Sequence, residues 1–84
     1  MNAVEIKAKL RPHLSKLFNV PEEKITDTAN FFTDLNVDSL MMLEVVSLIE
    51  SECNVTLKQE EDAAKLTSLD ECANVAIERM ASLV

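Results

Sequence analysis

The chain has 84 residues, a length that fits one small domain spanning residues 1–84. It contains 0 Gly and 2 Pro, so the composition predicts helices and excludes the glycine-rich loops that cradle nucleotide phosphates. Its net charge of −7 comes from 15 acidic and 8 basic residues. This charge excludes nucleic acid and anionic membranes as partners. It favours partners with basic surfaces, although solubility alone explains the charge equally well.

The first predicted helix covers about residues 2–18. Asn2 and Glu5 have the spacing of a capping pair. Pro12 lacks an amide hydrogen and its ring crowds the Ala8 carbonyl, at a cost of about 3 kcal/mol. We therefore expect a kink between these two residues, with two short helices as the alternative. The apolar residues at near-helical spacing are Val4, Ile6, Leu10, Leu14, Leu17 and Phe18.

A long connection follows, over residues 19–37. A structureless loop of this length is uncommon in a compact domain. We expect it to be ordered and pinned across the helices, with a short turn of helix at residues 31–35. The apolar side chains that it can add to the core are Ile25, Phe31, Phe32 and Leu35.

The second helix is predicted to begin at Asp38–Ser39, because Asp is a strong N-cap and favours the positive end of a helix. A short helix is expected over residues 58–66. Ser68 and Glu71 form a capping box for a last helix that ends near Leu83. The fold class is all-α, a small four-helix bundle with three main helices, a short third helix and a long ordered loop between helices 1 and 2. The predicted buried stripes are Leu40, Leu43, Val46, Ile49 and Cys53, then Leu69, Cys72, Ala73, Ala76, Ile77 and Met80.

The residues offer little for catalysis, and we predict no catalytic residue and no metal site. His13 stands beside no nucleophile motif and is interpreted as a bystander. Cys53 and Cys72 lie on apolar stripes, where packing is the expected role. Too few cysteines are present for a disulfide-rich secreted domain, and no apolar run has the length of a membrane span. We expect a cytoplasmic protein with reduced thiols.

Ser39 is the one position that suggests a modification. It follows an Asp, precedes an apolar helix and ends a long loop. A hydroxyl in the first turn of a helix is usually exposed. A phosphate attached there would lie beside free backbone amides and the positive end of the helix dipole. The alternative is that Asp-Ser simply starts a helix, which is the commoner meaning of this dipeptide.

Residues 30–40, Asn-Phe-Phe-Thr-Asp-Leu-Asn-Val-Asp-Ser-Leu, resemble the signature loop of acyl carrier proteins. Glu44 stands where that family has an acid in the following helix, and residues 22–26 and 60–66 are also similar to the family. The resemblance implies that Ser39 receives 4′-phosphopantetheine from coenzyme A through a phosphopantetheinyl transferase. Asp38 matches the family acid next to the metal at that transfer. The arm would carry acyl groups as thioesters, and the protein would catalyse nothing itself.

Two departures from the family pattern lead to further predictions. Asn36 replaces a glycine, so we expect a positive φ there. Met41 and Met42 make the start of the helix more apolar than in fatty-acid carriers. We expect Met41 to be exposed, and leave open whether Met42 fills the core. This apolar start favours a carrier in polyketide or mixed polyketide–peptide synthesis, with fatty-acid synthesis as the alternative.

The resemblance also implies partners and surfaces. The partners would be the transferase, followed by an acyltransferase, a ketosynthase or other acyl-processing enzymes with basic docking surfaces; we expect a monomer. The implied docking residues are Val37, Leu40, Met41, Leu43, Glu44, Ser47 and Glu50. The implied acyl pocket is Phe31, Phe32, Val46, Ile49, Leu57, Leu66 and Cys72. The competing class is a non-acylated acidic helical adaptor that makes no use of Ser39.

Overall fold

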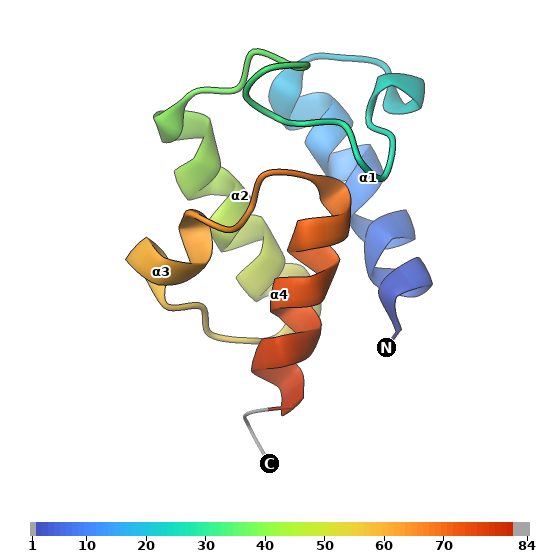
Figure 1. Cartoon of the computed structure of the whole chain (residues 1–84). Helices are drawn as coiled ribbons and strands as arrows, with labels where there is room; N and C mark the ends of the chain where they lie inside the picture. The colour runs from blue at the N-terminus through green and yellow to red at the C-terminus, as the bar shows by residue number, and fades with distance from the viewer. Residues whose placement is uncertain (1, 82–84) are drawn as a thin grey trace.

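The computed structural model describes residues 2–81, apart from the side chains of residues 59 and 60. It contains α1 (Ala3–Phe18), the 3₁₀ turn η1 (Glu22–Lys24), α2 (Ser39–Cys53), α3 (Gln59–Ala63) and α4 (Leu69–Ala81), and no strand within that range. Helix α1 packs against both α2 and α4, and α3 lies against α2 (Figure 1). This arrangement confirms the predicted all-α fold with its short third helix and long loop. None of the helices in the described part of the chain is long and apolar enough to cross a membrane.

Helix α1 begins at the predicted cap and runs without a break through Pro12. The Asn2 side chain accepts from the Glu5 amide at 2.9 Å, and Glu5 Oε1 accepts from the Asn2 amide at 3.2 Å. The alternative of two short helices is therefore wrong, while the kink stays a prediction. The helix ends at Asn19, whose φ of 57° turns the chain into the loop.

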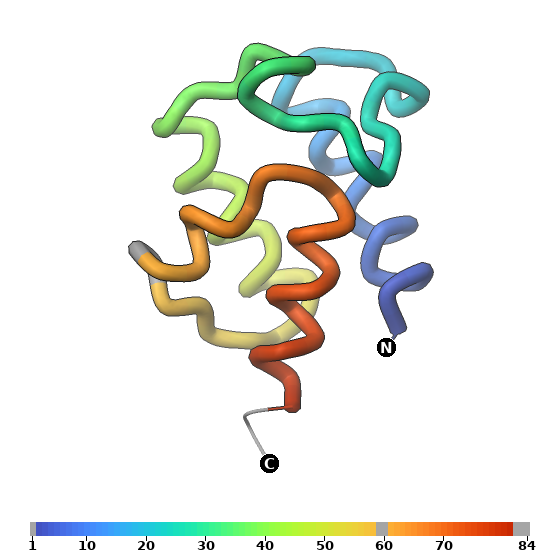
Figure 2. The backbone as a smooth tube through the Cα atoms, in the orientation of Figure 1, coloured from blue at the N-terminus to red at the C-terminus, as the bar shows by residue number. Residues whose placement is uncertain are grey.

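The loop is ordered and supplies core, as predicted. Ile25 and Phe31 are buried, and the Phe31 ring meets Phe18 edge to face, with 5.1 Å between centroids. The Phe31 amide donates to the Thr67 carbonyl at 2.9 Å, which ties the loop to the segment before α4. Figure 2 shows the loop arching from the end of α1 to the start of α2. Residues 31–35 form a hydrogen-bonded turn rather than a short helix, and the 3₁₀ turn lies earlier, at Glu22–Lys24.

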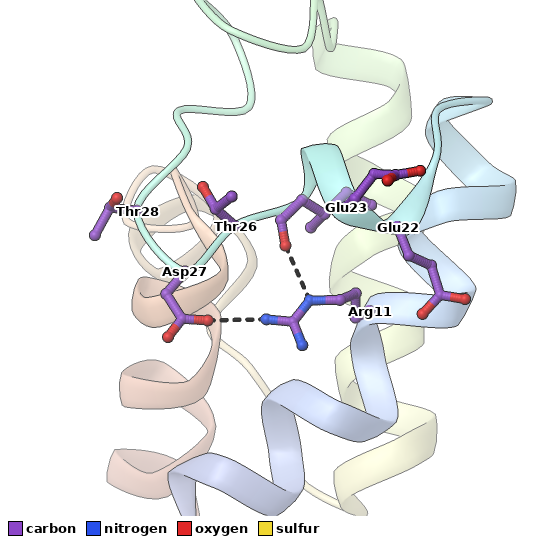
Figure 3. A pocket seen from close by; sticks show the side chains of 7 residues that line it. Arg11, Glu22, Glu23, Thr26, Asp27 and Thr28 are labelled. Atoms are coloured by element: carbon purple, nitrogen blue, oxygen red, sulfur yellow. Dashed lines mark hydrogen bonds and ion pairs between the residues drawn. The ribbon is translucent and has the colours of Figure 1, made fainter.

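Two cations of α1 hold the first half of the loop. Arg11 Nε donates to the Ile25 carbonyl and Arg11 Nη2 to Asp27, both at 2.9 Å. Lys7 Nζ lies 2.7 Å from Asp70 and 3.2 Å from Asp27, and these two carboxylates raise the pKa of Lys7. Figure 3 shows Arg11 reaching across a shallow surface hollow to the loop. The sequence analysis missed these contacts, because nothing in a charge pattern pairs residues so far apart in the chain.

Helix α2 buries a different face from the predicted one. Leu40 and Leu43 are 75% and 58% exposed, so their assignment to the buried stripe is wrong. The helix is apolar on more than one face. The spacing of its apolar residues therefore fits two orientations of the helix about its own axis equally well. The side chains that α2 buries are Met42, Val45, Val46, Ile49 and Cys53.

The last two helices follow the predicted order with adjusted limits. Helix α3 ends at Ala63, so the predicted helix over residues 58–66 is too long. Ser68 Oγ accepts from the Glu71 amide at 3.2 Å, which confirms Ser68 as the cap of α4. The predicted end near Leu83 lies outside the described residues. In α4, Ile77 is 37% exposed and Met80 is half-buried, whereas Val75 is buried, so the inward face is rotated toward Val75.

Candidate functional site

A turn closed by side chains precedes α2. The Asn30 side-chain oxygen accepts from the amides of Phe32 and Thr33, at 2.9 and 3.0 Å. The Asp34 carboxylate accepts from the Asn30 amide at 2.8 Å, and the Asp34 amide donates back to the Asn30 carbonyl at 2.9 Å. Asn and Asp are suited to this because their short side chains can bond to nearby backbone groups. The turn therefore has a fixed shape without glycine.

The turn is joined to α2 through one strained residue and one buried residue. Asn36 has a φ of 56°, which confirms the predicted left-handed backbone. Val37 is 5% exposed and its amide donates to the Phe31 carbonyl at 2.9 Å. Val37 thus anchors the turn to the core, and its buried side chain is not available to a docking partner.

Asp38 caps α2 as predicted. Its Oδ1 accepts from the Met41 amide at 2.9 Å, and its carbonyl accepts from the Met42 amide at 3.2 Å. An Asp cap of this kind typically contributes about 1 kcal/mol to helix stability. The cap fixes where α2 begins, and so it fixes Ser39 as the first helical residue.

The Ser39 side chain is exposed at the N-terminus of a 15-residue helix. Within residues 2–81 its hydroxyl and its amide make no hydrogen bond, and neither does the Leu40 amide. Free amides and the helix dipole both favour a negative group at this end. A phosphodiester on the Ser39 oxygen therefore fits: the hydroxyl can be reached, and the product charge would lie beside unbonded N–H groups.

The exposed members of the predicted docking set share one face of α2. Met41 is half-buried against the core and Met42 is 5% exposed. The expectation of an exposed Met41 is therefore wrong, and the open question about Met42 is answered: it fills the core. Spacings of three and four residues place the other exposed positions on one side of a helix. We call this side the α2 outer face: Leu40, Leu43, Glu44 and Ser47.

The acidic residues of α2 differ in whether they form hydrogen bonds or ion pairs within the chain. The Glu50 carboxylate is half-buried and accepts from the Leu57 amide at 2.9 Å. Glu52 Oε1 lies 2.8 Å from the His13 ring nitrogen Nε2, which links α2 to α1. Glu44 is exposed, and within residues 2–81 it has no hydrogen-bond or ion-pair partner. Glu44, the acid on the α2 outer face, can therefore pair with a cation of another molecule without first losing a contact within this chain.

The predicted acyl-pocket residues lie together in the core with one exception. Phe32 is 41% exposed and lies outside. Burial raises the pKa of Cys72 to about 12 and also raises the pKa of Cys53, and both thiols are free. These two cysteines therefore pack as small apolar side chains, as predicted. The buried members of the set are Phe31, Val46, Ile49, Leu57, Leu66 and Cys72.

The helical fold, the side-chain-closed turn and the exposed serine at a helix start fit a carrier domain. A family model described as "Phosphopantetheine attachment site" matches residues 8–75, a range that includes the turn and Ser39. The chain belongs to the phosphopantetheine-binding acyl carrier protein family. Its members carry a covalently bound phosphopantetheine and are carriers rather than enzymes.

Three relatives are each named acyl carrier protein. The protein from Buchnera aphidicola is 39% identical over 69 residues, which is 82% of this chain and 84% of the relative. The protein from Cylindrotheca is 33% identical over 66 residues, covering 79% and 81%. The protein from Thermosynechococcus vestitus is 35% identical over 71 residues, covering 84% and 86%. The chain therefore matches nearly the whole length of each relative.

Proposed function

We propose that Ser39 is the residue that carries the 4′-phosphopantetheine arm, and that the chain presents acyl groups on this arm to partner enzymes. The exposed and unbonded Ser39 hydroxyl at the start of α2 is the observation that carries the proposal. When bound, the arm supplies a thiol that holds acyl groups as thioesters. A thioester is a good acyl donor, and the flexible arm raises the local concentration of the acyl group at a partner's active site.

The serine oxygen is the one atom of this chain that forms a new bond in the attachment step. The Ser39 oxygen forms a bond to the phosphorus that bears pantetheine in coenzyme A, while the pyrophosphate bond breaks and the adenosine bisphosphate leaves. The hydroxyl proton passes to the transferase or to solvent. Asp38 binds the Met41 amide through one carboxylate oxygen. We propose that its other oxygen contributes to the metal site of the transferase at this step.

Fatty-acid synthesis is better supported than polyketide synthesis as the pathway. The polyketide interpretation rested on an apolar helix start made by Met41 and Met42. Met42 is buried and Met41 packs partly against the core, so the pair adds little apolar surface. The relatives carry the plain name acyl carrier protein. We therefore propose a fatty-acid-type carrier, in the cytoplasm, where free thiols such as Cys53 and Cys72 stay reduced.

The α2 outer face is proposed as the docking surface for the transferase and for acyltransferase and ketosynthase partners. Leu40 and Leu43 offer exposed apolar area beside the attachment point, and Glu44 offers an unpaired charge to a basic surface. Val37 and Glu50 support this face and are not part of it, because Val37 is buried and the Glu50 carboxylate accepts from the Leu57 amide. The carrier is expected to meet its partners as a monomer.

A loading experiment tests this proposal. The protein is incubated with coenzyme A and a promiscuous phosphopantetheinyl transferase and is then weighed by mass spectrometry. We expect a gain of about 340 Da, the mass of one arm. The gain should disappear in Ser39→Ala and persist in Ser51→Ala, a matched change at an exposed serine of α2 that lies outside the α2 outer face. Absence of any gain in the folded wild-type protein would contradict the carrier function.

The pathway is tested separately with the loaded protein. Purified fatty-acid synthesis enzymes and purified polyketide synthesis enzymes are each supplied with the malonylated carrier. Elongation by the first set at a rate well above the second supports the proposed pathway, and the reverse order contradicts it.

A further inference from the structure

A buried ion pair joins α3 to α4. Arg79 Nε lies 2.8 Å from Asp62 Oδ2, and Arg79 Nη2 lies 2.8 Å from Asp62 Oδ1. The Asp62 side chain is 1% exposed, whereas the acids of the other described ion pairs, Asp27, Asp70 and Glu52, are 50%, 39% and 23% exposed. A planar guanidinium facing both carboxylate oxygens also fixes orientation, which a single contact does not.

The same carboxylate holds the start of α3. Asp62 Oδ2 accepts from the Lys58 amide at 2.8 Å, and the Asp62 amide donates to the Lys58 carbonyl at 2.7 Å. Helix α3 has 5 residues, too few to be stable alone. Beside Asp62, its described side chains are the exposed Glu61 and the partly buried Ala63. Among the described side chains of α3, Asp62 is therefore the one that joins the helix to both α4 and the preceding segment.

Helix α3 is part of the segment that connects α2 to α4, and this segment contributes side chains to the core. Leu57 comes before it and Leu66 after it, and both are buried, at 4% and 0% exposed. Both belong to the acyl-pocket set. Figure 1 shows α3 beside α2 and α4, away from α1. A shift of α3 would therefore move two side chains that line the proposed pocket.

We propose that the Asp62–Arg79 pair is a positioning element that limits how much of an acyl chain the core takes in. This inference rests on the proposed function. The pocket residues are already packed together, so an acyl chain must displace side chains. The short helix α3, which lies in the chain between Leu57 and Leu66, is the helix with the least intrinsic stability. Burying each methylene favours uptake by about fourfold. Breaking the pair leaves a buried charge uncompensated and opposes uptake.

The test is a series of acyl chains on the loaded protein. Acetyl, butyryl, hexanoyl and octanoyl groups are attached to the wild-type carrier and to Arg79→Gln and Asp62→Asn. The measured quantity is the rate at which neutral hydroxylamine cleaves each thioester, relative to the same acyl-pantetheine free in solution. We expect both variants to slow cleavage of the octanoyl thioester by about tenfold, the equivalent of fewer than two buried methylenes. Acetyl rates should not change.

Arg11→Gln is the matched control. Arg11 also bonds to a carboxylate and to the loop, and it lies on α1, which Figure 1 shows away from α3. In Arg11→Gln the cleavage rate should depend on acyl chain length in the same way as in the wild type. Profiles that are identical in the wild type and both pair variants overturn the proposal, as does protection of the octanoyl group in Arg11→Gln to the same degree. A failure to load any arm overturns the carrier function itself, and this outcome is distinguished by mass before any rate is measured.

Hydrogen exchange on the wild-type protein keeps the test independent of whether the variants fold. The amides of residues 58–66 are compared between the acetyl and octanoyl forms. The proposal predicts equal exchange in both forms, because the pair stays closed over chains of this length. Exchange that becomes faster in these amides alone when octanoyl is attached overturns it.

Discussion

Acid is expected to weaken the wild-type protein more than it weakens the variant Asp62→Asn. Hydrogen bonds from Arg79 lower the pKa of Asp62 from 3.8 to about 2. A shift of one pKa unit corresponds to about 1.4 kcal/mol, so the ionised carboxylate contributes about 2 kcal/mol to the free energy of unfolding. Because the folded pKa is the lower one, this contribution is fully present above about pH 4. It is lost as the pH falls through about 2.

The assay is urea unfolding followed by circular dichroism at a series of pH values from neutral to strongly acid. The quantity of interest is the difference in unfolding free energy between the wild type and Asp62→Asn, because the other carboxylates are common to both proteins. We expect this difference to shrink by about 2 kcal/mol over the acid range. Glu61→Gln changes an exposed acid of the same helix and should show no such trend. A difference that does not vary with pH would show that Arg79 does not stabilise the ionised form of Asp62.

Substitutions at four other positions have expected outcomes. Asn36→Ala should lower the unfolding free energy by about 1 kcal/mol, because alanine resists a φ of 56°, whereas Asn36→Gly should not; urea unfolding measures both. Pro12→Ala should raise the unfolding free energy by up to about 3 kcal/mol in the same assay. Leu43→Ala should change stability by less than about 0.5 kcal/mol yet weaken binding to a ketosynthase in surface plasmon resonance. Glu44→Gln should slow association with such a partner at low salt, and the effect should fade at high salt.

Local sequence signals were sufficient for the starts of α1 and α2 and for the left-handed backbone of Asn36, but not for the form of the turn at residues 31–35. Caps act over three or four residues, so Asn2 and Asp38 could be recognised from their neighbours alone. The positive φ of Asn36 followed in the same way, because few residues tolerate that backbone. Ser39 is proposed as the attachment residue because its local setting and its family motif agree.

The sequence could not predict which side of α2 is buried, or which residues far apart in the chain are in contact. Helix α2 is apolar on more than one side, so the spacing alone did not distinguish Leu40 and Leu43 from the buried residues. Packing against α1 decides the question. The contacts of Arg11 with the loop and of Asp62 with Arg79 join residues 14 to 17 positions apart, which no helical or turn pattern relates.

Peptide mapping of the loaded protein locates the arm and so tests whether it is bonded to Ser39. There is no Lys or Arg between Lys24 and Lys58, so trypsin releases residues 25–58 as one peptide that contains Ser39, Ser47 and Ser51. Fragmentation of this peptide from the loaded protein assigns the added mass to one side chain. The account predicts the mass on Ser39 alone. Its assignment to Ser47, Ser51 or any residue outside this peptide would contradict the account.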